Sequence, residues 1–306
     1  MRMPRRLLWM TAAAACVAAT AVPAAAAGGP PFPQPGAQSS PPGANDWSCH
    51  PTPAHPRPVV LVHGLGADMS ENWAYISPLI AAQGYCVFAL TYGVDPRGTI
   101  PPFDQMGGVV PMEQSAQQLS TFVNQVLTTT GASKVDIVGH SEGSLMPDHY
   151  ARFLGGAARI DRYVGITPLW AGTNVLGLAT MEQYGRGPGL SPPVVAGFAR
   201  ICGSCPEFLN GSPFIEKLNS AGGPVAAGVT YTNLMTRYDE AVVPYTSGRL
   251  DLPGVTNIVV QDQCPNDISG HGAMAYDPVV AQDVINALDP AHASAVRCDQ
   301  PPPIMG

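Results

Sequence analysis

The sequence predicts one α/β domain in which a mostly parallel sheet is covered by helices on both faces. Short apolar runs rich in Val, Ile and Leu recur along the chain, as expected for strands buried on both sides. Stretches with helical periodicity separate several of these runs, and strands that alternate with helices form parallel sheets. With 306 residues, 45% of them hydrophobic, the chain can build one large buried core.

Six apolar runs are expected to be the strands, and two stretches the helices that flank them. Leu119, Phe122, Val123, Val126 and Leu127 recur at helical spacing and predict a helix between the second and third strands. A closing helix is expected over 278–288. The predicted strands are 59–62, 86–90, 135–138, 163–166, 229–234 and 255–260.

The remaining segments divide the chain. Residues 1–27 have the form of a signal peptide, with three arginines, an apolar run and an Ala-Ala-Ala cleavage site. The run is short and prolines follow it, so a cleaved leader is favoured over a membrane anchor; general and twin-arginine export both stay open. Residues 28–48 predict a Pro/Gly-rich arm, and 49–306 a single domain. Within that domain, 170–223 is loop-rich and predicts a cap-like insertion above the sheet.

Six cysteines remain beyond the leader, an even number that predicts three disulfides in a secreted chain. The spacing of Cys202 and Cys205 would fit half of a zinc site, but no second such pair follows, so we expect a structural bond and no metal or cofactor. Without its leader the chain has twelve basic and 22 acidic residues, a formal charge of −10. Nucleic acid is therefore not an expected partner, and the mature protein is expected to be a monomer.

The chemistry is indicated by Gly139-His-Ser-Glu-Gly143, between the strand ending at Val138 and a helix that runs toward Phe153. A G-x-S-x-G motif on a strand-turn-helix is the nucleophile elbow of the α/β-hydrolase fold, where glycines permit a tight turn that exposes the serine. The motif predicts Ser141 as a nucleophile, and we expect His140 to have a supporting role.

A serine hydroxyl needs a histidine that accepts its proton. His149 lies in the helix that follows the elbow and cannot reach back, and His292 lies in a polar tail that favours a solvated side chain. His271 lies between glycines in a loop after the last predicted strand. It is therefore the predicted base.

The base needs a carboxylate partner, and the fold orders the three residues Ser, acid, His along the chain. Asp239 follows the predicted strand 229–234, at the sheet edge where such folds bind ligands. Glu240 and Asp267 are the alternatives. Glu240 is expected to face solvent, and Asp267 to shape the loop of His271.

The developing oxyanion needs backbone N–H donors. One is expected from Glu142, the residue after the nucleophile. The other is expected from Leu65, in the His63-Gly-Leu-Gly66 turn that follows the first strand. We expect His63 to have a supporting role.

Taken together, these motifs resemble the secreted actinobacterial class 2 triacylglycerol lipases and, more remotely, Candida antarctica lipase B. The resemblance covers about residues 49–298. It departs from the family pattern at Leu65, where a hydroxyl-bearing residue is often found, and at Gly270, where many relatives have aspartate. The residues that carry it are Pro58-Val-Val-Leu-Val-His-Gly64, Asn72-Trp73, Gly139 to Gly143, Tyr231-Thr-Asn-Leu234, Tyr238-Asp-Glu240, Cys264, His271 and Tyr276-Asp-Pro278.

The resemblance implies a metal-independent hydrolase of acyl esters or lipids, with disulfides Cys49–Cys86, Cys202–Cys205 and Cys264–Cys298. An acyltransferase on cell-envelope lipids is an alternative. A secreted binding protein that keeps the fold without catalysis is another, and a peptidase is conceivable.

Overall fold

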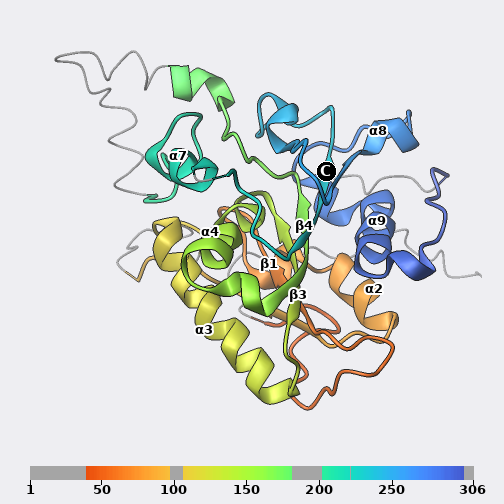
Figure 1. Ribbon diagram of the computed structural model, residues 1–306. Helices are drawn as coiled ribbons and strands as arrows, with labels where there is room; N and C mark the ends of the chain where they lie inside the picture. Colours follow the sequence, from red (N-terminus) through yellow and green to blue (C-terminus); the bar gives the residue numbers. More distant parts are fainter. Residues whose placement is uncertain (1–38, 97–105, 181–201, 221, 300–306) are drawn as a thin grey trace, which may run out of the picture.

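The computed structural model describes residues 39–96, 106–180, 202–220 and 222–299 (Figure 1). The predicted leader, 1–27, lies outside these residues. Six parallel strands form one sheet in the order β2-β1-β3-β4-β5-β6. The strands are β1 (Val59–Val62), β2 (Val87–Leu90), β3 (Val135–His140), β4 (Ile160–Ile166), β5 (Thr230–Met235) and β6 (Val255–Val259).

Each of the six apolar runs forms a strand, and the differences lie at the ends. β4 begins three residues earlier than predicted, at Ile160, although Asp161 and Arg162 are polar. Asp136 of the neighbouring strand accepts the backbone N–H of Arg162 at 3.0 Å, which holds this polar start in the sheet. Val260 was expected to end β6, but it begins the short helix α8 (Val260–Gln263).

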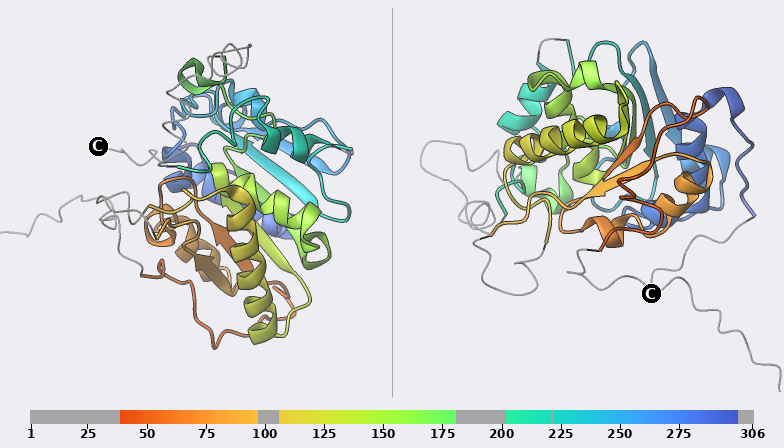
Figure 2. Two further views of the ribbon diagram at one scale, coloured as in Figure 1. Left: turned by 90° about the vertical axis from the view of Figure 1, so that its left-hand side faces the viewer. Right: turned by 90° about the horizontal axis from the view of Figure 1, so that it is seen from below.

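Helices cover both faces of the sheet, as Figure 1 and the right-hand view of Figure 2 show. On one side lie α3 (Met112–Thr130), α4 (Met146–Phe153) and α7 (Pro213–Asn219), and on the other α2 (Ile76–Ala82), α8 and α9 (Pro278–Leu288). The short helix α1 (Met69–Asn72) follows β1, and six 3-10 turns, η1 to η6, complete the described elements. These turns are Ser141–Ser144, Gly156–Arg159, Val175–Gly177, Tyr245–Gly248, Ala273–Tyr276 and Pro290–His292.

The core has two halves because successive side chains of a strand point to opposite faces. In β1, Val60 and Val62 belong to the cluster that includes Leu119 and Val123 of α3. Val59 and Leu61 belong to the other cluster, which includes residues of α2 and α9. All four β1 side chains are fully buried. β1 therefore packs against the helices on both faces of the sheet, and this packing fixes the position of the turn that follows it.

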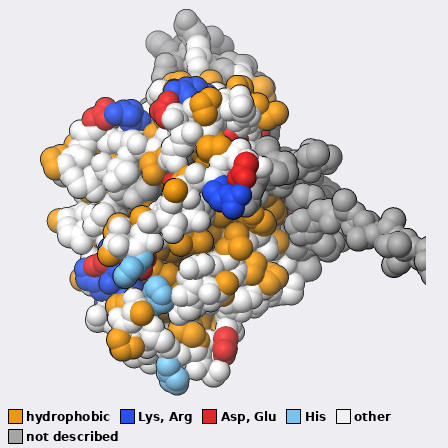
Figure 3. Space-filling model, turned by 90° about the vertical axis from the view of Figure 1, so that its right-hand side faces the viewer, with side chains coloured by type: hydrophobic (Ala, Val, Ile, Leu, Met, Phe, Trp, Pro, Cys, Tyr) orange, Lys and Arg blue, Asp and Glu red, His pale blue; other side chains and the backbone are white. Residues whose placement is uncertain are grey.

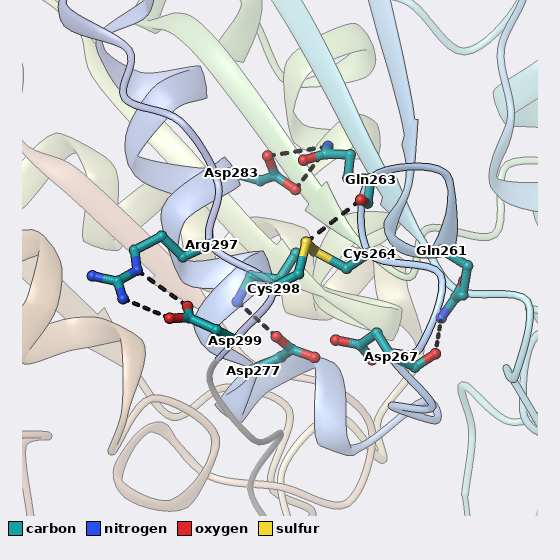
Figure 4. Close-up of a disulfide and its surroundings, with 10 residues drawn as sticks. Gln261, Gln263, Cys264, Asp267, Asp277, Asp283, Arg297, Cys298 and Asp299 are labelled. Atoms are coloured by element: carbon teal, nitrogen blue, oxygen red, sulfur yellow. Dashed lines mark hydrogen bonds and ion pairs between the residues drawn. A yellow bond between two sulfur atoms is a disulfide. The ribbon is translucent and has the colours of Figure 1, made fainter.

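Three disulfides join Cys49 to Cys86, Cys202 to Cys205 and Cys264 to Cys298. These are the pairs that the resemblance implies. The third bond ties the C-terminal segment to the end of α8, at the start of the loop that contains His271 (Figure 4).

The segment before Cys49 packs on the sheet from residue 39 onward. Ala44 forms a parallel bridge with Val87 of β2, and the Asn45 side chain exchanges two 2.9 Å hydrogen bonds with the backbone of Ala89. Described residues of the predicted arm therefore extend the edge of the sheet next to β2, which gives this end of the chain a fixed path along the domain.

Charged side chains are sparse on the face of the molecule in Figure 3, where they lie among hydrophobic and uncharged ones. On the face in Figure 3, Lys and Arg lie in separate groups beside acidic side chains rather than in a continuous patch. Ion pairs such as Arg237–Asp262 and Arg249–Asp251 have this form. Among the residues that the structure describes, no helix is long and apolar enough to cross a bilayer.

Candidate active site

The elbow forms where β3 ends and η1 begins. Ser141 has a φ of +56°, a left-handed conformation that is strained for a residue with a side chain. The flanking glycines permit it. A Cβ on Gly139 would lie 1.8 Å from the carbonyl oxygen of Gly143, and a Cβ on Gly143 would lie 2.1 Å from that of Val62. The backbone of the elbow therefore packs directly against itself and against the end of β1.

The folded chain brings Ser141, His271 and Asp239 into contact. The Ser141 hydroxyl Oγ lies 2.8 Å from His271 Nε2, and His271 Nδ1 lies 2.9 and 3.1 Å from the two carboxylate oxygens of Asp239. With its proton on Nδ1, a neutral imidazole donates to Asp239 and can accept from Ser141. The Asp239 side chain is 2% exposed and that of His271 13%. The Asp239 carboxylate that holds the ring is thus shielded from solvent, while the imidazole itself stays partly accessible.

Asp239 is fixed by its own loop, which follows β5. Its Oδ1 accepts the backbone N–H groups of Ala241 and Val242 at 3.0 and 2.7 Å. Thr173, from the first part of the predicted insertion, braces this loop: its hydroxyl donates to the Ala241 carbonyl at 2.7 Å and accepts the Val243 N–H at 2.9 Å. Sequence reasoning missed Thr173, because nothing in its local sequence marks it as a partner of residues almost 70 positions away.

The alternative acids have other partners. Asp267 is buried and accepts the N–H of Ser269 at 2.8 Å, so it shapes the loop before His271. Glu240 stays exposed, but its carboxylate accepts the backbone N–H of His271 at 2.9 Å. Neither carboxylate forms a hydrogen bond with the imidazole, whereas Asp239 contacts it with both oxygens.

The alternative bases lie away from Ser141. His149 is buried in α4 with its ring centroid 5.0 Å from that of Phe153 and 5.7 Å from that of Phe214. His292 is exposed, and its Nδ1 lies 2.8 Å from Asp289. Neither histidine forms a hydrogen bond with Ser141, whereas His271 does.

The turn after β1 lies against the nucleophile. A Cβ on Gly64 would lie 3.2 Å from Cβ of Ser141, so this turn passes directly over the elbow. Asn72 fixes it: its Oδ1 accepts the Gly64 N–H at 3.0 Å. Leu65 follows Gly64, and Glu142 is the second residue of η1, where backbone N–H groups have no intrahelical acceptor. The two expected oxyanion donors thus belong to neighbouring turns.

Buried side chains support this turn. His63 stacks on Tyr92, with ring centroids 4.3 Å apart, and lies with Nδ1 2.8 Å from the Gly64 carbonyl oxygen and Nε2 3.2 Å from the Tyr92 N–H. Nδ1 must therefore donate and Nε2 accept, which requires a neutral ring. Burial lowers the pKa of His63 to about 4, in agreement with that requirement. Burial also raises the pKa of Glu142 well above its usual range.

His140 links the elbow to two neighbouring segments. Its Nδ1 lies 2.9 Å from Oδ1 of Asn72, and its Nε2 lies 3.1 Å from the carbonyl oxygen of His271. Burial and the neighbouring His271 lower the pKa of His140 to about 3, so the ring is neutral at pH 7 and carries one N–H. Depending on the tautomer, His140 donates this proton either to Asn72 from Nδ1 or to His271 from Nε2. Asn72 is a further residue whose role the sequence did not reveal; it entered only as part of the family resemblance.

A model of the class 2 lipase family matches residues 56–284. The chain belongs to this family. The match spans β1 through most of α9 and so includes the elbow, Asp239 and His271. The class 2 lipase family was the one that the sequence motifs indicated.

Two curated relatives are triacylglycerol lipases. Those of Pseudarthrobacter phenanthrenivorans and Burkholderia plantarii are each 31% identical to this class 2 lipase over 99 residues, or 31% of the chain. The matched part is 28% of the first protein and 25% of the second. The chain thus matches about a quarter of the length of these relatives.

Solved structures share the fold. Lipase B of Aspergillus fumigatus superposes with a TM-score of 0.58 at 18% identity, over 85% of this chain and 57% of that one. The propeptide form of a Bacillus licheniformis lipase gives 0.50 at 17%, over 68% and 46%. The chain therefore has the α/β-hydrolase fold that the elbow motif predicted.

Proposed function

We propose that this class 2 lipase hydrolyses carboxylic esters, with acyl lipids as the substrate class, and that Ser141, His271 and Asp239 perform the reaction. The observation that carries the proposal is the continuous hydrogen-bonded path from the Ser141 hydroxyl through the imidazole to Asp239. The strained backbone of Ser141 and membership of the lipase family also support it.

In the proposed first half-reaction, Ser141 Oγ attacks the ester carbonyl carbon while His271 Nε2 accepts the hydroxyl proton. The Leu65 and Glu142 N–H groups stabilise the resulting oxyanion, with each such donor contributing about 3 kcal/mol in related serine hydrolases. His271 then donates the proton to the departing alcohol, and the acyl group remains on Ser141. Asp239, hydrogen-bonded to Nδ1, orients the ring and stabilises the imidazolium.

In the second half-reaction, His271 accepts a proton from water, which attacks the acyl-enzyme. A second oxyanion collapses, the carboxylic acid leaves, and the proton returns to Ser141. Because a protonated imidazole cannot accept a proton, activity is expected to fall as the medium becomes acidic. No step requires a metal, and the described residues contain no cluster of three metal-binding side chains.

The test compares Ser141→Ala, His271→Ala and a matched control, His292→Ala, on p-nitrophenyl esters. The control removes an exposed histidine that also pairs with an aspartate. We expect loss of turnover in the first two variants, with unchanged circular dichroism, and wild-type rates in the control. Retained turnover in Ser141→Ala would refute the proposed nucleophile.

Labelling separates catalysis from binding alone. A fluorophosphonate is expected to label the wild-type chain at Ser141 and to leave Ser141→Ala unlabelled. Absence of labelling in a folded wild-type protein would favour a binding protein that keeps the fold. Product analysis with an added long-chain alcohol distinguishes water from an alcohol as acceptor, and a new ester as the main product would identify an acyltransferase.

We further propose that the protein is secreted after removal of residues 1–27, and that the insertion at about 170–223 borders the acyl site. Three disulfides support the first proposal, because such bonds persist in oxidising compartments. The bracing of the acid loop by Thr173 supports the second. N-terminal sequencing of protein from the medium tests export. A change in acyl-length preference across an ester panel, after shortening of the insertion, tests its role.

A further inference from the structure

Each polar group of His271 has a partner, and the partners come in two consecutive pairs. Ser141 contacts Nε2 at 2.8 Å, and His140, the residue before it, lies 3.1 Å from the backbone carbonyl oxygen. Asp239 contacts Nδ1 at 2.9 Å, and Glu240, the residue after it, accepts the backbone N–H at 2.9 Å. The backbone of the base is thus held from the same two segments that hold its ring.

We propose that Glu240 is a positioning residue that keeps the imidazole of His271 between Asp239 and Ser141. The inference rests on the proposed function, because it assigns Glu240 a role through that base. Glu240 contacts the peptide group and not the ring, so it acts on the orientation of the side chain through the backbone. A misplacement of about 1 Å at such a site lowers rates by about 100-fold in other enzymes.

The loop around His271 has few other ties close to the base. Thr236 donates to the Ser269 carbonyl at 2.7 Å, two residues before His271, and the Met274 N–H donates to the Gly270 carbonyl at 3.2 Å. Neither bond fixes the peptide plane between Gly270 and His271 from the nitrogen side. Glu240 does so, because one of its carboxylate oxygens accepts the His271 N–H at 2.9 Å.

Gly270 gives the carboxylate its access. A Cβ at this position would lie 2.7 Å from Oε2 of Glu240 and 3.4 Å from the carbonyl oxygen of Tyr238. Gly270 does not have a positive φ, so the backbone would accept another residue. The absence of a side chain at Gly270 therefore lets the Glu240 carboxylate approach the backbone closely, and an unusual turn is not the reason for this glycine. The Glu240 contact thus depends on Gly270.

This pairing makes a double-mutant cycle decisive. Because the obstructed atom is the end of a flexible side chain, an added methyl group would displace the Glu240 carboxylate without disturbing the backbone. Gly270→Ala should thus reproduce the effect of Glu240→Ala. In the Glu240→Ala background, Gly270→Ala should have little further effect, since the bond it breaks is already gone.

The experiment measures kcat and KM on p-nitrophenyl esters for Glu240→Ala, Glu240→Gln, Gly270→Ala and the double variant. Glu216→Ala, which removes an exposed glutamate on α7, is the matched control. We expect kcat to fall about tenfold in Glu240→Ala and in Gly270→Ala, equivalent to about 1.4 kcal/mol, with KM nearly unchanged. Glu240→Gln keeps an acceptor oxygen and should recover most of kcat.

A second readout does not depend on turnover. The His271 Nδ1 proton, held by Asp239, gives a low-field proton resonance that should broaden or vanish in Glu240→Ala and persist in Glu240→Gln. The proposal would be overturned if Glu240→Ala changed neither kcat nor the resonance. It would also be overturned if kcat fell as far in Glu240→Gln as in Glu240→Ala, or if the losses of kcat in Glu240→Ala and Gly270→Ala were additive in the double variant. Retained turnover in Ser141→Ala would instead refute the proposed function, and the resonance would still test the positioning of His271.

Discussion

Asp148 provides the clearest link between burial and stability in this fold. The carboxyl lies in the first turn of α4 and is fully buried. Its Oδ1 accepts the Tyr231 hydroxyl at 2.9 Å, while Oδ2 has no hydrogen-bond partner among the described residues. Burial raises the pKa of Asp148 from 3.8 to about 7, and the bond from Tyr231 opposes this shift only in part.

The sign of the effect follows from proton binding. Between pH 3.8 and about 7 the folded chain binds more protons at Asp148 than the unfolded chain does. The free energy of unfolding therefore decreases through this window as pH rises, and the loss levels off above it. A difference of about three pKa units corresponds to about 4 kcal/mol in full, of which about 2 to 3 kcal/mol develops between pH 5 and pH 8.

Asp148→Asn removes this ionisation and keeps an oxygen that can accept from Tyr231. We expect the variant to gain stability over the wild type as pH rises, by about 2 to 3 kcal/mol more at pH 8 than at pH 5. Urea unfolding of both proteins at the two pH values, with disulfides intact, measures the difference. Comparing the two pH values removes any pH-independent effect of the amide.

Glu216→Gln is the control, because it removes one negative charge from an exposed position on α7. Its stability relative to the wild type should differ little between pH 5 and pH 8. If Asp148→Asn behaved like this control, Asp148 would be ionised in the folded protein at little cost, and the reasoning from burial would be refuted.

Three further predictions concern the elbow and its surroundings. Gly143→Ala would push a methyl group to 2.1 Å from the carbonyl oxygen of Val62, so we expect lost esterase activity and a destabilisation of about 1 to 3 kcal/mol in urea unfolding; a fully active variant would contradict this. Replacing both Cys264 and Cys298 by Ser opens a loop of sequence separation 34 and should lower the free energy of unfolding by about 4 kcal/mol, whereas an unchanged urea midpoint would show that the bond adds nothing. Glu142→Gln replaces a carboxyl whose pKa burial raises, so its stability should fall less steeply than that of the wild type as pH rises above 4.5, the ordinary pKa of the group; parallel pH profiles would count against a protonated Glu142.

Features set by local sequence were predicted correctly. Fully buried strands such as β1 and β3 are continuous apolar runs, so the sequence marks them clearly. The ends are less clear: β4 starts with polar residues that Asp136 holds in the sheet, and Val260 keeps an apolar character although it begins α8. At β4, a contact with the neighbouring strand decides where the element begins.

The same distinction applies to the candidate site. Ser141 was predicted from its motif, and Asp239 and His271 from chain order and the positions of strands; the fold brings these three residues into contact. Thr173 and Glu240 could not be assigned roles in this way, because they act on backbone groups of segments far away in sequence. A hydroxyl or carboxylate that binds a backbone group leaves no pattern in the local sequence.

The joint at Thr173 sets a limit for engineering. Thr173 and the Asn174 N–H bind the loop of Asp239 on both sides of Val242. The first residues of the proposed insertion are therefore held by the same hydrogen bonds as the acid loop. Chimeras that exchange insertions between relatives should therefore splice after Asn174. A junction placed earlier would replace Thr173 and Asn174 and so remove the hydrogen bonds that hold the loop of Asp239.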